Sequence, residues 1–155
     1  MKKLIPIVIA VLCLSATTAS AARIADGYAD IRWGTELDQV MKSYPRGNLE
    51  KIHNNYLYRQ FNPNQEIFLR TFIFDDNKLI AVSLKFNPDF VKKTGIEKLL
   101  AKHRKVYGFG TIDRTQAPHV ITYFWETPRT RISFGYAPKR PDMTIMLYQQ
   151  KQSSP

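Results

Sequence analysis

The stretch Thr35–Tyr44 reads TELDQVMKSY, and its pattern returns at Thr94–His103 as TGIEKLLAKH. Each copy begins with Thr, places an acid three residues on, and places apolar residues two, five and six residues on. A Thr followed by an acid in the first turn is typical of a helix N-terminus, so Thr35 and Thr94 are predicted caps. The apolar spacing predicts one amphipathic helix in each copy.

Alternating patterns follow each helix and predict three strands in each half of the chain. The predicted strands are Tyr56–Phe61, Ile67–Phe74 and Leu79–Phe86, then His119–Glu126, Arg131–Ala137 and Met143–Gln149. The tetrad Asp75–Lys78, DDNK, predicts a tight turn between two of them. Ala29–Trp33 is predicted to add a short leading strand.

This order of elements predicts an α+β domain made of a tandem helix-strand-strand-strand repeat. The two repeats cover about residues 35–86 and 94–149. Because the helices are separated from the hairpins, we expect an antiparallel sheet of six or seven strands with both helices on one face. Trp33 is expected to pack the start of the first helix against the sheet, and Lys151–Pro155 is expected to form a frayed tail.

The first 22 residues have the layout of a secretory signal, which predicts a periplasmic or secreted protein. Lys2 and Lys3 precede an apolar run that is too short to cross a membrane, and small residues follow it. We expect cleavage after Ala21 or Ala22, which leaves one domain at residues 23–150 without any cysteine. Lipid attachment at Cys13 is the alternative, although Leu12 is bulky for that signal.

Positive charge is concentrated in the C-terminal half of the chain. The formal charge of +10 falls to +8 once Lys2 and Lys3 leave with the signal. Between Lys92 and Arg140 eleven basic residues face three acids. For an exported protein this favours an envelope protein or an anionic envelope component as partner, and not nucleic acid.

Several predicted strands carry bulky side chains on both faces, so two helices cannot cover all of them. We therefore expect an open sheet face rich in aromatic residues and arginine, the composition of an interaction surface. The candidate binding residues are Tyr56, Tyr58, Arg59, Phe68, Arg70, Phe124, Trp125, Arg129, Arg131, Lys139 and Arg140. The alternatives are a homodimer, or a second layer formed by the N-terminal segment and a loop at Gly47–Asn55.

No catalytic signature is present in the sequence, and we expect neither an enzyme nor a bound metal or cofactor. His53, His103 and His119 lack metal-ligand spacing, and His103 falls on the apolar stripe of the second helix as a packing residue. The tetrad at Asp75 has too few ligands for a hard cation. There is no nucleophile elbow, phosphate-binding glycine loop or paired cysteine motif.

Trp33-Gly34-Thr35 with Val40, the Tyr44-Pro45 stop, and Phe72-x-Phe74-Asp75-Asp76-Asn77-Lys78-Leu79 resemble the β-lactamase-inhibitor-protein-like fold. The small lipoprotein of the outer-membrane β-barrel assembly machinery has this fold. The resemblance implies a non-enzymatic periplasmic domain whose sheet face or edge meets a protein or envelope component. The chain differs from these proteins in lacking a lipid-attachment signal and disulfides, and no binding residue can be matched.

Two functions follow as hypotheses. The first is a protein-interaction or inhibitor-type module with aromatic anchors on the open face and arginines that steer an acidic partner. The second is a binder of an anionic polymer, lipid head group or small ligand at Arg129, Arg131, Lys139 and Arg140. These four residues lie in or next to two connections that we expect to be near one another at the end of the sheet.

Overall fold

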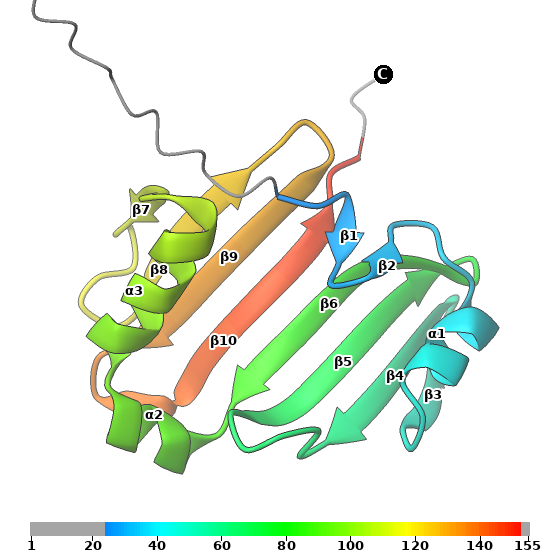
Figure 1. Cartoon of the computed structure of the whole chain (residues 1–155), viewed down its shortest axis with the longest axis horizontal. Helices are drawn as coiled ribbons and strands as arrows, with labels where there is room; N and C mark the ends of the chain where they lie inside the picture. The colour runs from blue at the N-terminus through cyan, green and yellow to red at the C-terminus, as the bar shows by residue number, and fades with distance from the viewer. Residues whose placement is uncertain (1–23, 153–155) are drawn as a thin grey trace, which may run out of the picture.

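The computed structural model describes residues 24–152 as a large antiparallel sheet with three helices and a small hairpin (Figure 1). The small hairpin is β1 (Gly27–Tyr28) with β2 (Ile31–Arg32). The first half continues with α1 (Leu37–Ser43), β3 (Asn48–Ile52), β4 (Asn55–Phe61), β5 (Ile67–Asp75) and β6 (Lys78–Phe86). The second half contains α2 (Pro88–Thr94), α3 (Ile96–Tyr107), β7 (Thr111–Asp113), β8 (Ile121–Glu126), β9 (Thr130–Ala137) and β10 (Arg140–Gln150).

The eight-stranded sheet consists of two four-stranded meanders joined by their last strands. Its order is β3-β4-β5-β6-β10-β9-β8-β7, and all neighbours are antiparallel. At the join, Val82 of β6 lies opposite Tyr148 of β10, and Leu84 lies opposite Met146. The sheet is therefore continuous from one half to the other (Figure 1).

The helices and the β1-β2 hairpin lie on one face of this sheet (Figure 1). Residues that lie directly opposite one another on paired strands have their side chains on the same face of the sheet. The register therefore defines the row of side chains that faces the helices and the hairpin. That row is Tyr58, Phe72, Val82, Tyr148, Ile132 and Trp125. Leu37 and Val40 of α1 and Leu99 and Leu100 of α3 are buried in the same core.

The opposite face of the sheet carries no helix of the described chain, and we call it the uncovered face (Figure 1). Its central row alternates with the buried one and has three small polar residues at its centre, interrupted by one leucine. That row is Arg59, Thr71, Ser83, Leu147, Ser133 and Phe124.

The structure confirms the α+β class, the antiparallel sheet and several local predictions. The turn at Asp75–Lys78 joins β5 to β6, with Asp76 and Asn77 at positive φ as a primed two-residue turn requires. Trp33 is buried, and its indole N–H donates to Thr130 Oγ1 at 2.9 Å. None of the helices in the described range is long and apolar enough to cross a membrane.

The predicted number of strands was wrong. The expected loop at Gly47–Asn55 contains the edge strand β3, and β7 adds a three-residue strand at the other edge. Both are short and largely exposed, so neither shows the hydrophobic alternation that predicts a strand. The leading strand expected at Ala29–Trp33 is instead the hairpin β1-β2, which lies outside the main sheet.

The predicted helix caps were also wrong. Thr35 Oγ1 donates to the Arg32 carbonyl at 2.8 Å and caps nothing, while Thr94 is the last residue of α2. Helix α2, which periodicity alone missed, begins after Asn87, whose side chain accepts from the Asp89 N–H at 3.0 Å. Gly95 separates α2 from α3 at φ 83°, a conformation that a residue with a Cβ rarely adopts.

The two ends of the chain fall partly outside the described residues. The predicted signal segment and its cleavage site, at residues 1–22, lie outside the described range, as do residues 153–155 of the tail. Lys151 is held and not frayed, because its N–H donates to the Arg129 carbonyl at 2.9 Å and its ammonium pairs with Glu126.

Candidate functional site

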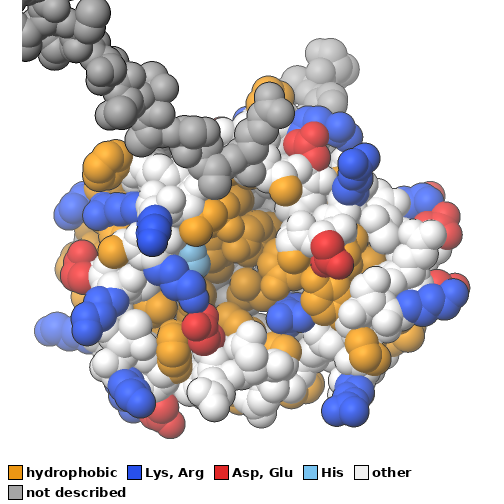
Figure 2. Space-filling view, viewed as in Figure 1, with side chains coloured by type: hydrophobic (Ala, Val, Ile, Leu, Met, Phe, Trp, Pro, Cys, Tyr) orange, Lys and Arg blue, Asp and Glu red, His pale blue; other side chains and the backbone are white. Residues whose placement is uncertain are grey.

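The helix-covered face contains a groove between α3 and the β1-β2 hairpin, which we call the central groove. It has a volume of about 280 Å³. Apolar side chains gather in the hollow between the two helix-covered sides of the molecule (Figure 2). Its lining residues are Tyr28, Asn64, Glu66, Ile67, Arg70, Leu84, Phe86, Lys102, His103, Val106, Tyr107, Met146 and Tyr148.

The floor of the central groove is the seam between the two meanders. Leu84 and Phe86 come from β6, and Met146 comes from β10. Because β6 and β10 pair through Leu84 and Met146, both side chains stand on the helix-covered face. The groove therefore exists only where the two halves of the chain meet.

Arg70 is the cationic side chain of the floor. It lies opposite Gln60 on β4 and Leu84 on β6, on the helix-covered face. Its guanidinium carbon is 5.8 Å from the ring centroid of Tyr28 and 5.0 Å from that of Tyr44. Two aromatic rings thus hold the cation in place through cation–π contacts.

Arg70 has few polar partners for a half-buried cation. Its Nη1 donates to Gln60 Oε1 at 3.2 Å, and Gln60 Nε2 donates to the Pro45 carbonyl at 2.7 Å. Within residues 24–152 no carboxylate pairs with Arg70, and its buried Nε has no acceptor. A buried donor without an acceptor costs about 1–3 kcal/mol, so this guanidinium is poorly compensated.

Phenol groups line the groove next to Arg70. The hydroxyls of Tyr107 on α3 and Tyr148 on β10 are 3.2 Å apart, and the rings of Tyr28 and Tyr148 meet edge-on at 5.0 Å. Burial raises the pKa of Tyr148 and also that of Tyr28 above the ordinary value. The hydroxyls of Tyr28 and Tyr148 therefore stay protonated and act as hydrogen-bond donors or acceptors.

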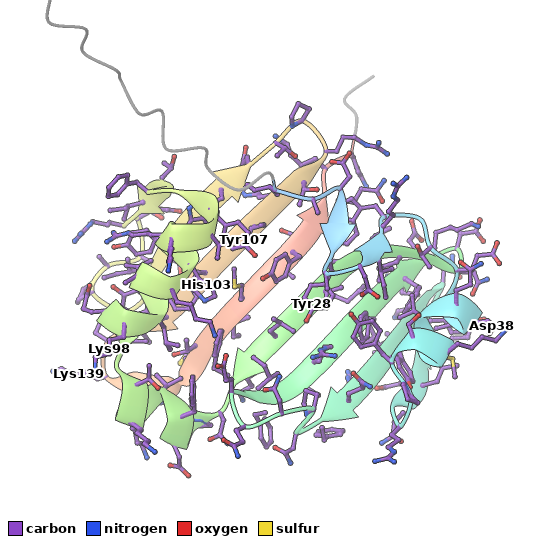
Figure 3. All side chains as sticks on the ribbon, viewed as in Figure 1. Tyr28, Asp38, Lys98, His103, Tyr107 and Lys139 are labelled. Carbon is purple, nitrogen blue, oxygen red and sulfur yellow. The ribbon has the colours of Figure 1, made fainter. Side chains whose placement is uncertain are left out.

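His103 forms part of the α3 wall as a neutral side chain. Its ring lies 5.1 Å from Phe134 and stacks on Tyr107 at 6.4 Å. Burial, with a smaller contribution from Lys102, lowers the pKa of His103 to about 4. Figure 3 shows His103 and Tyr107 on α3, with Tyr28 across β10 from them. The packing role predicted for His103 is thus confirmed.

An ion pair joins α3 to the β4–β5 connection at the groove. Lys102 Nζ lies 2.9 Å from Glu66 Oε2 and 3.1 Å from Glu66 Oε1. The two charges cancel and His103 is neutral, so Arg70 supplies the net charge of the lining. The arrangement can hold a ligand that has an apolar part and one negative charge.

Two of the predicted aromatic anchors lie on the wrong face for the open-face hypothesis. Tyr58 is 2% exposed and Trp125 is 4% exposed, and both lie in the row beneath the helices. Tyr58 is held by two hydrogen bonds of 2.7 Å, donating to the Tyr44 carbonyl and accepting from the Gly47 N–H. Tyr56 shares this face and is half-buried. The expectation of an open face built on these aromatics was therefore wrong.

Other predicted residues do lie on the uncovered face. Arg59 pairs with Glu50, and Phe124 lies under Arg131 at 4.1 Å. Phe68 is exposed and meets Phe61 edge-on at 6.4 Å. Of the predicted residues, Arg70 alone belongs to the lining of the central groove.

The predicted arginine-rich end of the sheet does not form. Arg129 precedes β9 and Lys139 follows it, so the eight residues of β9 separate them by roughly 23 Å. The arginines already have acidic partners within the domain. These pairs are Arg129–Asp26 at 3.4 Å, Arg131–Glu126 at 3.1 Å and Arg140–Asp142 at 2.7 Å.

The remaining groove residues were not predicted as a site. Tyr28, Tyr107 and Tyr148 come from three elements far apart in the chain, and only the β6–β10 pairing brings them together. Nothing local in the sequence predicts that pairing. Only the period-two pattern of β10 could have placed Met146 and Tyr148 on a common face.

Comparison with known proteins found no match for this chain. No family model, no curated protein and no solved structure matches it. Across residues 24–152 no cluster of three or more His, Cys, Asp or Glu side chains is placed to hold a metal ion.

Proposed function

We propose that this protein is an exported, non-enzymatic binding domain and that its central groove receives the apolar part of a small ligand. The observation that carries the proposal is the composition of the groove, in which an apolar floor meets aromatic walls and a few convergent polar groups. Ligand sites have this composition. The charge of the lining favours an anionic envelope component among the partners considered.

The organisation of the chain supports a second part of the proposal, that the two halves are copies of one unit. Each half contains a helix followed by a four-stranded meander, and the sheet order is mirrored about the β6–β10 seam. We also infer that the fold belongs with the β-lactamase-inhibitor-protein-like domains, on the resemblance around Trp33–Leu79. In this account the groove is a site between the copies.

A blocking variant tests the location of the ligand. Val106 lines the groove and is 41% exposed, so Val106→Trp fills the opening without disturbing the core. Ile112 on β7 is equally exposed at 41% and lies outside the lining, so Ile112→Trp is the matched control. We expect an uncharged fluorescent dye such as N-phenyl-1-naphthylamine to bind the wild type and Ile112→Trp alike, and Val106→Trp at least tenfold more weakly. Equal binding to both variants would show that the groove is not the site.

Protein interaction through the uncovered face is the second candidate function, with a second copy of this chain as the partner. One row of this face joins Phe61, Leu69, Lys85 and Ile145, and both Phe61 and Ile145 are exposed. Arg59 pairs with Glu50 there, Glu126 pairs with both Arg131 and Lys151, and Lys85 has no carboxylate partner within the described residues. Two of the arginines on this face have acidic partners, which lowers the charge repulsion between two copies of a basic domain, and the exposed apolar row supplies the contact.

Sedimentation equilibrium tests this second function. We expect a concentration-dependent dimer of residues 23–155 that is abolished by Phe61→Lys, since a lysine there adds like charges across the contact. Val106→Lys, on the helix-covered face, is the control and should leave the dimer intact. A wild-type protein that stays monomeric at millimolar concentration would rule out self-association.

A further inference from the structure

The charge of the central groove identifies the kind of head group that it can hold. Lys102 and Glu66 cancel each other, and the imidazole of His103 is neutral near pH 7. The guanidinium of Arg70 is left with a single uncompensated positive charge. A ligand that matches this lining carries one negative charge.

The contacts of Arg70 indicate that an anion completes them. Tyr28 and Tyr44 contact the guanidinium through their rings, and Gln60 accepts a single hydrogen bond. The rings and the neutral amide leave the cation without an ionic partner within the described chain. Carboxylates pair with guanidinium groups through short charge-assisted hydrogen bonds, about twice as strong as neutral ones.

The same lining favours a monoanionic carboxylate over a phosphate. A phosphate monoester carries up to two negative charges and three acceptor oxygens, and Arg70 is one cation. The carboxylate of Glu66 also belongs to the lining, and it repels a dianion more strongly than a monoanion.

The volume of the groove limits the apolar part of the ligand. About 280 Å³ lies just below the usual range for ligand sites, which suits one short chain and not a lipid with two chains. Leu84 and Phe86 at the base of the groove are 7% and 3% exposed, Met146 at the same base is fully buried, and Val106 stands at the exposed side. The available space therefore matches a single-chain amphiphile.

We infer that the central groove binds a single-chain carboxylate amphiphile, with its head group on Arg70 and its chain along the seam between β6 and β10. This inference rests on the proposed function, because it names the ligand class of the same groove. The hydroxyl pair of Tyr107 and Tyr148 lies beside the chain. Arg70 is the residue that determines the preference for an anionic ligand.

Displacement of N-phenyl-1-naphthylamine by three ten-carbon ligands tests the inference. The ligands are decanoate, decanol and decyl phosphate, each below its micelle concentration. We expect decanoate to bind the wild type at least tenfold more tightly than decanol, because a hydrogen bond to a charged group changes the affinity by about that factor. We also expect decanoate to bind more tightly than decyl phosphate. Arg70→Gln should remove the advantage of decanoate and leave decanol unchanged.

Two further variants keep the test decisive. Arg59→Gln removes an arginine from the neighbouring strand on the uncovered face, and it should leave all three affinities unchanged. Arg70→Lys keeps the positive charge but lacks the planar guanidinium group. It should therefore retain part of the preference for decanoate over decanol, and it provides a second reading if Arg70→Gln folds poorly.

Each contrary result has a distinct meaning. Equal binding of decanoate and decanol to the wild type, or a decanoate preference that survives Arg70→Gln, would overturn the head-group inference and leave the groove as a neutral site. Tighter binding of decyl phosphate would overturn the choice of carboxylate. Failure of the dye and of all three ligands to bind would overturn the proposed function itself.

Discussion

At the residue scale, His103 makes the stability of the domain depend on pH. Its pKa is lowered to about 4 by burial and, less strongly, by Lys102, while Glu66 acts in the opposite direction. An exposed histidine has a pKa near 6.5, so between about pH 6.5 and 4 the unfolded chain binds a proton that the folded chain does not. The free energy of unfolding therefore falls as pH decreases through this window, by up to about 3 kcal/mol.

Replacement of His103 tests this dependence. We expect His103→Leu to flatten the stability profile between pH 6.5 and 4, measured by urea unfolding at several pH values. His119→Gln removes an exposed histidine and should leave the slope as it is in the wild type. An unchanged slope in His103→Leu would assign the pH dependence to other groups.

Tyr58 gives a second prediction at this scale. Its hydroxyl joins the Tyr44 carbonyl to the Gly47 N–H and so fixes the chain between α1 and β3. Tyr58→Phe removes that bridge and leaves both backbone groups without a partner, which should cost about 1–3 kcal/mol in unfolding free energy. Tyr56→Phe, on the same strand and face, should cost much less because no hydrogen bond of its hydroxyl is present within the described chain. Equal losses in the two variants would contradict this role.

At the element scale, the strands at the seam, β6 and β10, contribute more to the stability of the fold than the edge strands β3 and β7. Ser83 of β6 lies opposite Thr71 of β5 and Leu147 of β10, so a proline there stands in the interior of the sheet with a neighbouring strand on each side. Glu50 of β3 has a neighbour on one side only, Leu57 of β4. The halves of the chain therefore depend on β6 to a degree that no edge strand matches.

Proline substitution measures this difference between strands. We expect Ser83→Pro to prevent folding or to lower the free energy of unfolding by more than about 3 kcal/mol, and Glu50→Pro to lower it by about 1 kcal/mol or less. Circular dichroism melts of the two variants distinguish these outcomes. A Ser83→Pro protein that melts like Glu50→Pro would mean that the halves fold without the seam.

The same scale shows which elements the sequence could predict. Signals that act within a few residues, such as the turn at Asp75–Lys78 and the apolar stripe of α3, predicted their elements correctly. Period-two alternation placed Tyr58 and Trp125 on a strand face, but it does not say which face the helices cover. The short exposed strands β3 and β7 have no pattern of their own, because pairing with a neighbour creates them.

At the scale of the whole molecule, the candidate site depends on one long-range pairing. β6 and β10 are far apart in the chain, yet their pairing places Leu84 beside Met146 and builds the floor of the central groove. Arg70 was predicted as a binding residue because the predicted strands are rich in aromatic residues and arginine. Its contacts with Tyr28 and Tyr44 appear only in the folded chain, since the three residues are far apart in the sequence. A binding site made at a seam cannot be predicted from patterns confined to either half.

The most direct test of this account is to map decanoate binding on isotope-labelled residues 23–155 by NMR chemical-shift perturbation. The account predicts saturable shifts confined to the central groove, at Tyr28, Arg70, Tyr107 and Tyr148, with none in the row of Thr71, Ser83 and Ser133 on the uncovered face. Shifts concentrated on that opposite row, or no saturable shift at any position, would contradict the claim that the groove binds the ligand.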